Sequence, residues 1–256
     1  MYKAKRRKGV KVKVINLSKL NILKYRSYAT VSVIVIISLM VGFYFKTNRD
    51  SLDVEAASAK EQIIVLDAGH GGEDSGATSA CGKHEKELNL EIAFCLGEML
   101  TEKGYTVVYT RTEDKLLYTE AENIKGIRKI SDLKNRCKIA REYPNALFIS
   151  IHMNSFNESK YSGLQVYYST QNEASESLAT HIQSSVKREL QPMNNRKIKA
   201  GKGIYVLENI ENPAVLIECG FLTNPEESEK LSKKEYQNLL SFSIICGIIE
   251  YMNTNT

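Results

Sequence analysis

Several patterns that would place this chain in a familiar class are missing from it. The Gly-rich stretch 69–72 has neither GxGxxG nor P-loop spacing, so it does not indicate a phosphate-binding loop. No internal repeat or low-complexity tract occurs. No two cysteines have CxxC spacing, which excludes a cysteine zinc cluster, and their odd number excludes complete disulfide pairing. We expect buried free thiols. The five are Cys81, Cys95, Cys137, Cys219 and Cys246.

Acidic residues are absent from the start of the chain. Residues 1–26 contain ten Lys/Arg and no Asp or Glu, and residues 27–45 carry no charge at all. A helix of that uncharged length spans about 28 Å, close to a bilayer core. The basic flank predicts a cytoplasmic tail over 1–26, a transmembrane anchor over 27–45 and export of the rest. A cleaved signal peptide is the alternative, but its best cleavage site, Ala57-Ser58-Ala59, lies too far downstream, so we favour an uncleaved segment.

The overall positive charge comes from this tail. Residues 1–60 hold 13 Lys/Arg and 3 Asp/Glu, and the remaining residues hold 22 and 27, a net charge of −5. An acidic domain is a poor nucleic-acid binder, whereas the basic tail suits anionic lipid. Residues 46–62 lack hydrophobic periodicity and predict a linker that spans about 20–25 Å as a flexible coil. The domain over 63–253 is therefore expected to work close to a membrane.

Strand and helix patterns alternate through that domain. Continuous apolar runs predict buried strands at 63–67, 105–110, 146–151 and 214–218, with weaker strand signals at 163–169 and 204–207. Helical spacing occurs at 86–103, 132–143, 173–190 and 234–252. This alternation predicts an α/β fold, a three-layer domain with a central, mainly parallel twisted sheet flanked by helices.

Polar residues follow or end three of the predicted buried strands. These are His70, His152 and Glu218. The carboxyl ends of parallel strands meet at one edge of a sheet, so these side chains are expected to converge. Two neutral imidazoles and one carboxylate suit a catalytic zinc ion, which keeps one position open for water.

The carboxylate ligand is expected from the segment just before the first predicted helix of the domain. By pattern alone His84, Glu85 and Glu87 remain open as candidates. The metalloprotease pattern HExxH is absent because position 88 is Leu, which excludes a helix of that kind.

Four motifs in order carry a family resemblance. They are Asp-x-Gly-His-Gly-Gly at 67–72, Glu-Lys-x-Leu-Asn-Leu at 85–90, Ser-Ile-His-x-Asn at 150–154 and Glu-x-Gly-Phe-Leu-x-Asn-Pro at 218–225. Together they resemble the zinc-dependent N-acetylmuramoyl-L-alanine amidases of the Amidase_3 type, over about residues 63–252. The resemblance implies that His70, Glu85 and His152 bind Zn²⁺ and that Glu218 is the catalytic residue. The implied reaction cuts the amide between N-acetylmuramic acid and L-alanine of the peptidoglycan stem peptide.

Within that family the chain is most similar to the sporulation-specific CwlD-type amidases, through its short anchor and the segment 124–133. That similarity implies a role in muramic-lactam formation in spore cortex, with the domain facing the cortex between the two spore membranes. Ala68, Ser155 and Cys219 depart from the usual family residues, but none of them removes a ligand.

In the expected mechanism the metal activates the water and the carboxylate transfers the proton. Zinc would lower the pKa of water to about 7, and Glu218 would carry the proton to the leaving nitrogen. Asn154 and Arg136 are expected to bind substrate or to support the ligands, and Arg111 and Arg136 either meet the acidic stem peptide or form structural ion pairs. An activating or regulatory protein partner is a further expectation. The competing hypotheses are a catalytically silent peptidoglycan-binding scaffold and a metal peptidase that cuts within the stem peptide.

Overall fold

The structure, a computed structural model, describes residue 40, residues 62–79 and residues 81–254. The predicted tail, membrane anchor and linker over 1–62 lie outside the described residues, apart from Met40 and Gln62. In the part that is described, no helix has both the length and the hydrophobicity needed to cross a membrane. The chain divides into the units Met1–Glu55 and Ala56–Thr256, and every element below belongs to the second.

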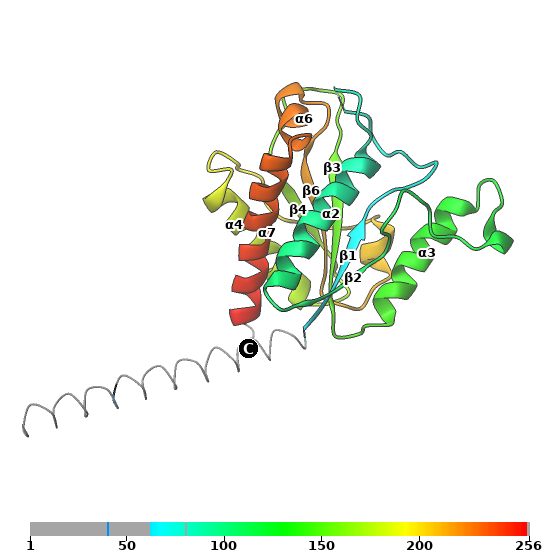
Figure 1. Cartoon of the computed structure of the whole chain (residues 1–256), viewed down its shortest axis with the longest axis horizontal. Helices are drawn as coiled ribbons and strands as arrows, with labels where there is room; N and C mark the ends of the chain where they lie inside the picture. The colour runs from blue at the N-terminus through cyan, green and yellow to red at the C-terminus, as the bar shows by residue number, and fades with distance from the viewer. Residues whose placement is uncertain (1–39, 41–61, 80, 255–256) are drawn as a thin grey trace, which may run out of the picture. The chain divides into compact units, whose positions relative to one another are not determined.

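A six-stranded sheet forms the centre of this domain (Figure 1). Its order is β2-β1-β3-β6-β4-β5. The first four strands in that order are parallel to one another, and β4 runs antiparallel to β6. The prediction of a mainly parallel sheet is therefore confirmed. The strands are β1 (Ile63–Ala68), β2 (Thr106–Tyr109), β3 (Leu147–Asn154), β4 (Gln165–Tyr168), β5 (Lys199–Ala200) and β6 (Ala214–Phe221).

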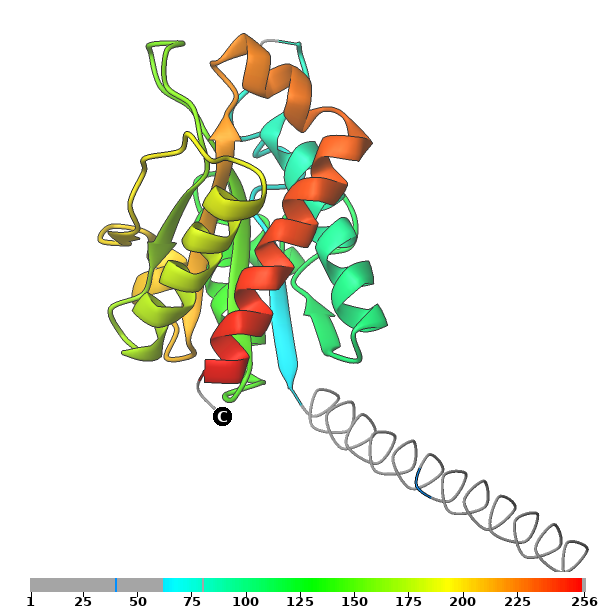
Figure 2. The same ribbon diagram turned by 90° about the vertical axis from the view of Figure 1, so that its left-hand side faces the viewer.

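Helices cover both faces of the sheet. Figure 2 shows α2, α4 and α7 side by side on one face, and α3 and α5 pack together on the other. The result is the predicted three-layer α/β arrangement. The helices are α2 (Glu85–Glu102), α3 (Arg128–Arg141), α4 (Ala174–Glu189), α5 (Tyr205–Glu208), α6 (Pro225–Leu231) and α7 (Lys234–Thr254), with a short 3₁₀ turn, η1 (Glu120–Glu122).

Alternation along β3 separates the two halves of the core. Ile149 and Ile151 are fully buried in the cluster shared with α2, α4 and α7, whereas Phe148 is fully buried in the cluster shared with α3 and α5. Because successive side chains of a strand point to opposite faces, Ser150 and His152 lie on the α3 side. The strand residues of the site therefore leave the sheet on the face that α3 and α5 cover.

Two predicted elements differ from the structure. The strand predicted at 204–207 is wrong, because Tyr205–Glu208 forms α5. A four-residue apolar run fits a strand or a helical turn equally well, and here Val206 and Leu207 pack into the α3 layer as part of a helix. The helix predicted at 132–143 begins earlier, at Arg128, and ends at Arg141.

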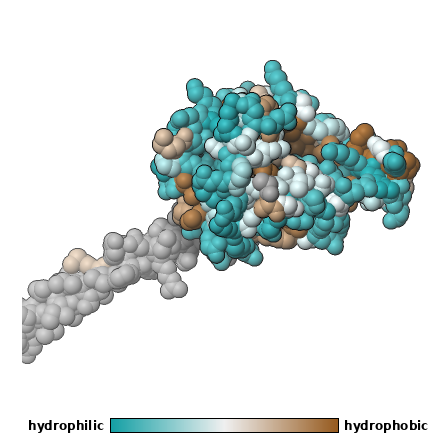
Figure 3. Space-filling model, turned by 90° about the horizontal axis from the view of Figure 1, so that it is seen from above, coloured by the Kyte–Doolittle hydropathy of each residue, from teal (hydrophilic) through white to brown (hydrophobic). Residues whose placement is uncertain are grey.

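The cysteines largely follow the expected pattern of free thiols. All five are free, and Cys95, Cys137 and Cys219 are buried. Cys81 is the exception, since it is exposed in the loop before α2. Seen from above in Figure 3, the surface is mostly hydrophilic with separate hydrophobic patches.

Candidate metal centre

The site forms where three neighbouring parallel strands reach their carboxyl ends. His70 follows β1, and His152 and Glu218 lie in the last halves of β3 and β6. His152 and Glu218 are register partners across the β3–β6 pair, so both side chains leave the sheet on the same face. Glu85 enters from outside the sheet as the first residue of α2.

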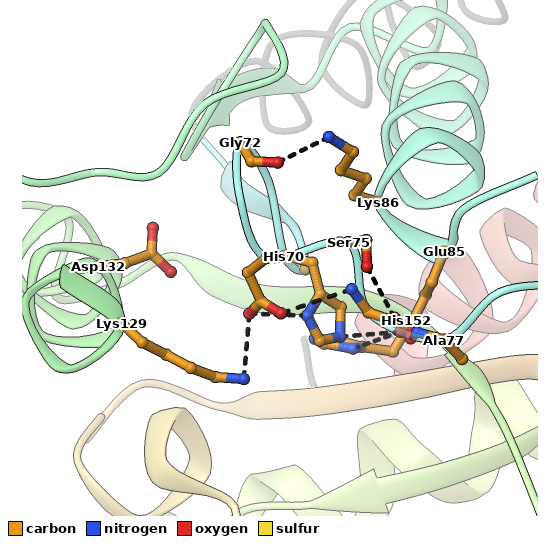
Figure 4. Close-up of polar contacts among 12 residues, drawn as sticks. His70, Gly72, Ser75, Ala77, Glu85, Lys86, Lys129, Asp132 and His152 are labelled. Atoms are coloured by element: carbon orange, nitrogen blue, oxygen red, sulfur yellow. Dashed lines mark hydrogen bonds and ion pairs between the residues drawn. The ribbon is translucent and has the colours of Figure 1, made fainter. Parts of the chain in front are cut away.

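The donor atoms of His70, Glu85 and His152 converge (Figure 4). They lie within 4.8 Å of one another. Glu85 Oε1 is 3.2 Å from His70 Nε2 and 3.0 Å from His152 Nδ1. The two imidazole rings meet nearly edge to face, with centroids 4.9 Å apart. One carboxylate oxygen is therefore shared between the two rings.

The structure separates Glu85 from the other two candidates for the carboxylate position. Glu85 is only 4% exposed, whereas Glu87 is exposed on the outer side of α2. His84 lies outside the converging group, and its Nδ1 is 3.3 Å from Thr78 Oγ1. Of the three alternatives left open by the sequence, only Glu85 joins the two histidines.

Hydrogen bonds fix the Glu85 carboxylate from several sides. Oε1 accepts the Met153 backbone N–H at 3.1 Å, and Oε2 accepts that of Ala77 at 2.9 Å. Burial by itself would raise the pKa of Glu85, but hydrogen bonds and charge from His152 and His70 outweigh burial and hold that pKa below its ordinary value. The group is consequently an ionised, immobilised acceptor.

His70 occupies an unusual backbone conformation. Its φ is +61°, in the left-handed region that non-glycine residues rarely adopt. Arg136 donates to its carbonyl oxygen at 2.8 Å, and the Arg111 guanidinium donates to the preceding carbonyl, that of Gly69, at 3.0 Å. These two contacts hold the turn that aims the imidazole inward.

Arg136 supports the site rather than reaching substrate. It is 1% exposed, and its guanidinium bonds Asp67 at 2.6 Å and Asp132 at 2.7 Å. Arg111 is also buried, and its guanidinium donates only to backbone carbonyl oxygens. Arg136 thus forms the structural ion pairs that were one of the two expectations, whereas Arg111 is held by backbone carbonyl oxygens. Asn154 is the other residue for which substrate binding or support of the ligands was expected. The pairing register of β3 with β6 shifts between His152 and Asn154.

Gly69 and Gly76 leave room for the ligands. A Cβ at Gly69 would lie 2.1 Å from His152 Nε2. A Cβ at Gly76, where φ is +64°, would lie 2.5 Å from Glu85 Oε2. The histidine ring and the carboxylate are therefore packed directly against bare backbone.

Glu218 carries an unsatisfied carboxyl oxygen in the site. Its Oε2 is buried and makes no hydrogen bond to any described residue. Burial raises the pKa of Glu218 to about 7. The charge of His152 opposes this rise, repulsion from Glu85 adds to it, and His70 has a smaller lowering effect. A carboxyl group with this pKa can both take up and release a proton at neutral pH.

The residues present fit a metal ion. Two imidazole nitrogens and one carboxylate oxygen converge, which is a donor set found in catalytic zinc sites. Glu85 Oε1 lies within hydrogen-bonding distance of a nitrogen of each imidazole, which places the three donors around one point. The buried, unpartnered Glu218 Oε2 adds a polar group close to that cluster.

The sequence argument missed two residues that shape the site. Asn89 Nδ2 donates to the Gly69 carbonyl at 3.0 Å and lies 3.5 Å from Glu85 Oε1. Asp74 Oδ2 lies 2.9 Å from His70 Nδ1. The available signals were the helical spacing of Asn89 from Glu85 and the acid four residues after His70.

Comparisons with known proteins agree with one another. Residues 64–250 match the family described as N-acetylmuramoyl-L-alanine amidase. The chain is 39% identical over 217 residues to the germination-specific N-acetylmuramoyl-L-alanine amidase of Bacillus subtilis, covering 84% of this chain and 90% of the relative. Among solved structures, it is similar to the CwlD amidase from Clostridioides difficile in complex with the GerS lipoprotein, with TM-score 0.73, 38% identity and coverage of 76% and 100%. It is also similar to an N-acetylmuramoyl-L-alanine amidase from Clostridium difficile 630, with TM-score 0.67, 31% identity and coverage of 76% and 98%.

Proposed function

We infer the function from this premise: the chain belongs to the N-acetylmuramoyl-L-alanine amidase family. It is an enzyme that hydrolyses the amide bond between N-acetylmuramic acid and the L-alanine of peptidoglycan stem peptides. The observation that carries the mechanism is the convergence of His70, Glu85 and His152, with Glu218 as the register partner of His152.

We propose that the metal is zinc and that these three residues hold it. His70 would offer Nε2, His152 would offer Nδ1 and Glu85 would offer Oε1, since these atoms face one another. When bound, zinc supplies Lewis-acid activation of a water molecule and of the amide carbonyl. The support from Met153 and Ala77 keeps the Glu85 carboxylate in place for that purpose.

Glu218 is proposed as the catalytic carboxylate. Its buried, unpartnered Oε2 can accept a proton from the attacking water and return it to the nitrogen of the departing L-alanine. No described residue competes for that oxygen. Amide hydrolysis needs this second transfer because an amine anion is a poor leaving group.

The biological role proposed is muramic-lactam formation in spore cortex. The germination-specific relative supports it, since the alignment covers nearly all of that protein. We also propose that residues 27–45 anchor the chain in a membrane with the catalytic domain outside the cytoplasm. In a sporulating cell the domain would then lie between the two spore membranes.

A protein partner is proposed as well. The similar CwlD amidase from Clostridioides difficile was solved in complex with the GerS lipoprotein. We propose that this chain has an activating or regulatory partner of its own. Zinc content and activity measured with and without candidate partners from the same cell would test this.

Product analysis tests the proposed reaction. Purified peptidoglycan is incubated with the full-length chain, and the products are identified by mass spectrometry. Intact stem peptides that begin with free L-alanine are expected. Shorter peptides would instead identify a peptidase that cuts within the stem, and binding without any product, with zinc and partners supplied, would identify a scaffold.

A further inference from the structure

The two ring nitrogens of His70 face different groups. Nε2 faces Glu85 Oε1 at 3.2 Å, on the side of the converging ligands. Nδ1 is buried and lies 2.9 Å from Asp74 Oδ2. The Nδ1 position is not aligned for a hydrogen bond with that oxygen, and it makes none with any other group among the described residues. A small rotation of the ring or the carboxylate would complete the one contact within reach.

A short closed loop brings Asp74 to this place. The backbone N–H groups of Gly71 and Asp74 each donate to the other residue's carbonyl oxygen at 3.0 Å. This double contact turns the chain back on itself, so residue 74 returns to the side of residue 70. The backbone hydrogen bonds alone therefore place Asp74 beside His70, independently of the contacts of the Asp74 side chain.

Helix α3 holds the same loop through two ion pairs. Lys129 Nζ lies 3.1 Å from Asp74 Oδ2, and Figure 4 shows Lys129 extended toward the side of His70. The neighbouring pair joins Arg128 Nη1 to Glu73 Oε2 at 2.6 Å. Only the first of these pairs reaches the oxygen that faces His70, which makes Glu73 a matched comparison for Asp74.

We propose that Asp74 is the positioning residue of His70, and that Lys129 holds the Asp74 carboxylate in place. A neutral imidazole has one N–H and one free lone pair, and an ionised carboxylate can only accept. With zinc on Nε2 the proton of His70 lies on Nδ1, where Asp74 faces it as an acceptor and holds the ring in the orientation that binds the metal. This inference rests on the proposed function, because it takes zinc as the ion at the converging atoms.

Zinc affinity provides the first test. The full-length chain is stripped of metal, and its affinity is measured by competition with a chromophoric chelator. Asp74→Ala is expected to bind zinc about 10–100-fold more weakly than the unmodified chain, the usual effect of losing a carboxylate behind a histidine ligand. Glu73→Ala, on the same loop but without contact to His70, is expected to leave the affinity unchanged.

Two milder variants keep the test decisive if Asp74→Ala folds poorly. Asp74→Asn keeps an acceptor oxygen but loses the charge, so a smaller loss than that of Asp74→Ala is expected. Lys129→Ala leaves the carboxylate in place without its cation and is expected to weaken zinc binding less than either. Because Lys129 is 63% exposed, its removal should barely change the fold.

The protonated nitrogen provides a readout that a merely structural role would not move. In the zinc-loaded chain the imidazole proton of His70 lies on Nδ1, and its proton NMR signal is expected to be shifted downfield and protected from solvent exchange by Asp74. Asp74→Ala should remove that shift and that protection. Equal zinc affinity in Asp74→Ala and Glu73→Ala, or a His70 Nδ1–H signal that Asp74→Ala leaves unchanged, would overturn the inference. A wild-type chain that binds no zinc would instead overturn the proposed function.

Discussion

His152 and Glu218 are register partners on adjacent parallel strands, and one is a proposed metal ligand while the other is the unsatisfied carboxyl group of the site. Their Cα atoms are held by the backbone ladder, and both side chains leave the same face of the sheet. The distance between the proposed base and the metal position is therefore set by the sheet rather than by a loop.

Glu218→Gln should abolish most activity without loss of zinc. Glutamine has nearly the same shape as glutamate but cannot carry a proton, so the rate of stem-peptide release is expected to fall about 10²–10⁴-fold. Zinc content measured on the same preparation should be unchanged, since Glu218 is outside the ligand group. Activity within a few-fold of the unmodified chain would assign proton transfer to another residue.

Gly69→Ala should damage the metal site without replacing any of the proposed ligands. The new Cβ would lie 2.1 Å from His152 Nε2, so the imidazole must move. Zinc affinity is expected to fall about 10–100-fold, the range seen when a ligand's surroundings are disturbed. Gly82→Asn, where no atom lies within 4 Å of the added Cβ, serves as the control and should bind zinc normally.

Removal of the metal should inactivate the enzyme but leave it folded. The two buried apolar clusters that join the sheet to its helices contain none of the three proposed ligands, so the core does not depend on the ion. Chelator treatment is expected to abolish product release, and added zinc should restore it. The melting temperature should rise again with zinc, since a ligand at about a thousandfold excess over its dissociation constant adds about 4 kcal/mol. An unfolded metal-free chain by circular dichroism would contradict this expectation.

The buried pair of Asp67 and Arg136 should make the fold sensitive to acid. Burial raises the pKa of Asp67, but Arg136, Ser150 and Thr110 outweigh burial and hold it below the ordinary value. A depressed native-state pKa means that the stabilisation is complete above the unfolded-state pKa, about 3.9, and is lost as the pH falls through the native-state value.

Asp67→Asn tests this pair. It should cost about 3–5 kcal/mol in the free energy of unfolding at neutral pH, because Arg136 is left as a buried charge with one partner fewer. It should also reduce the loss of stability at low pH, measured by urea unfolding across the acid range. Asp114→Asn, at an exposed ion pair with Lys86, should cost at most about 1 kcal/mol.

The sequence predicted the part of the site that depends on strand order. His70, His152 and Glu218 each follow or end a continuous apolar run, and parallel strands bring such positions to one edge. Glu85 was left in competition with His84 and Glu87 on pattern alone. Helical phase distinguishes Glu85 from Glu87, because Glu85 lies three and seven residues before the buried Leu88 and Ile92.

The supporting residues could not be predicted in the same way. Asp74 reaches His70 through the closed Gly71–Asp74 loop, and Arg136 bonds the His70 carbonyl across 66 positions of sequence. Neither contact corresponds to a periodic pattern in the sequence, because both depend on the three-dimensional course of the loops. The error at Tyr205–Glu208 has a related cause, since a short apolar run does not specify its own conformation.

The place of β6 in the sheet determines when the enzyme becomes competent during its own synthesis. β6 pairs with β3 on one side and β4 on the other, although it is the last strand made. Until Ala214–Phe221 is available, β3 can pair with β1 but has no strand on its other side, and the proposed proton carrier does not yet exist. A growing or truncated chain therefore contains His70, Glu85 and His152 without the ability to hydrolyse an amide. A cell-wall hydrolase with this topology is catalytically inactive until almost its entire length has been synthesised and folded.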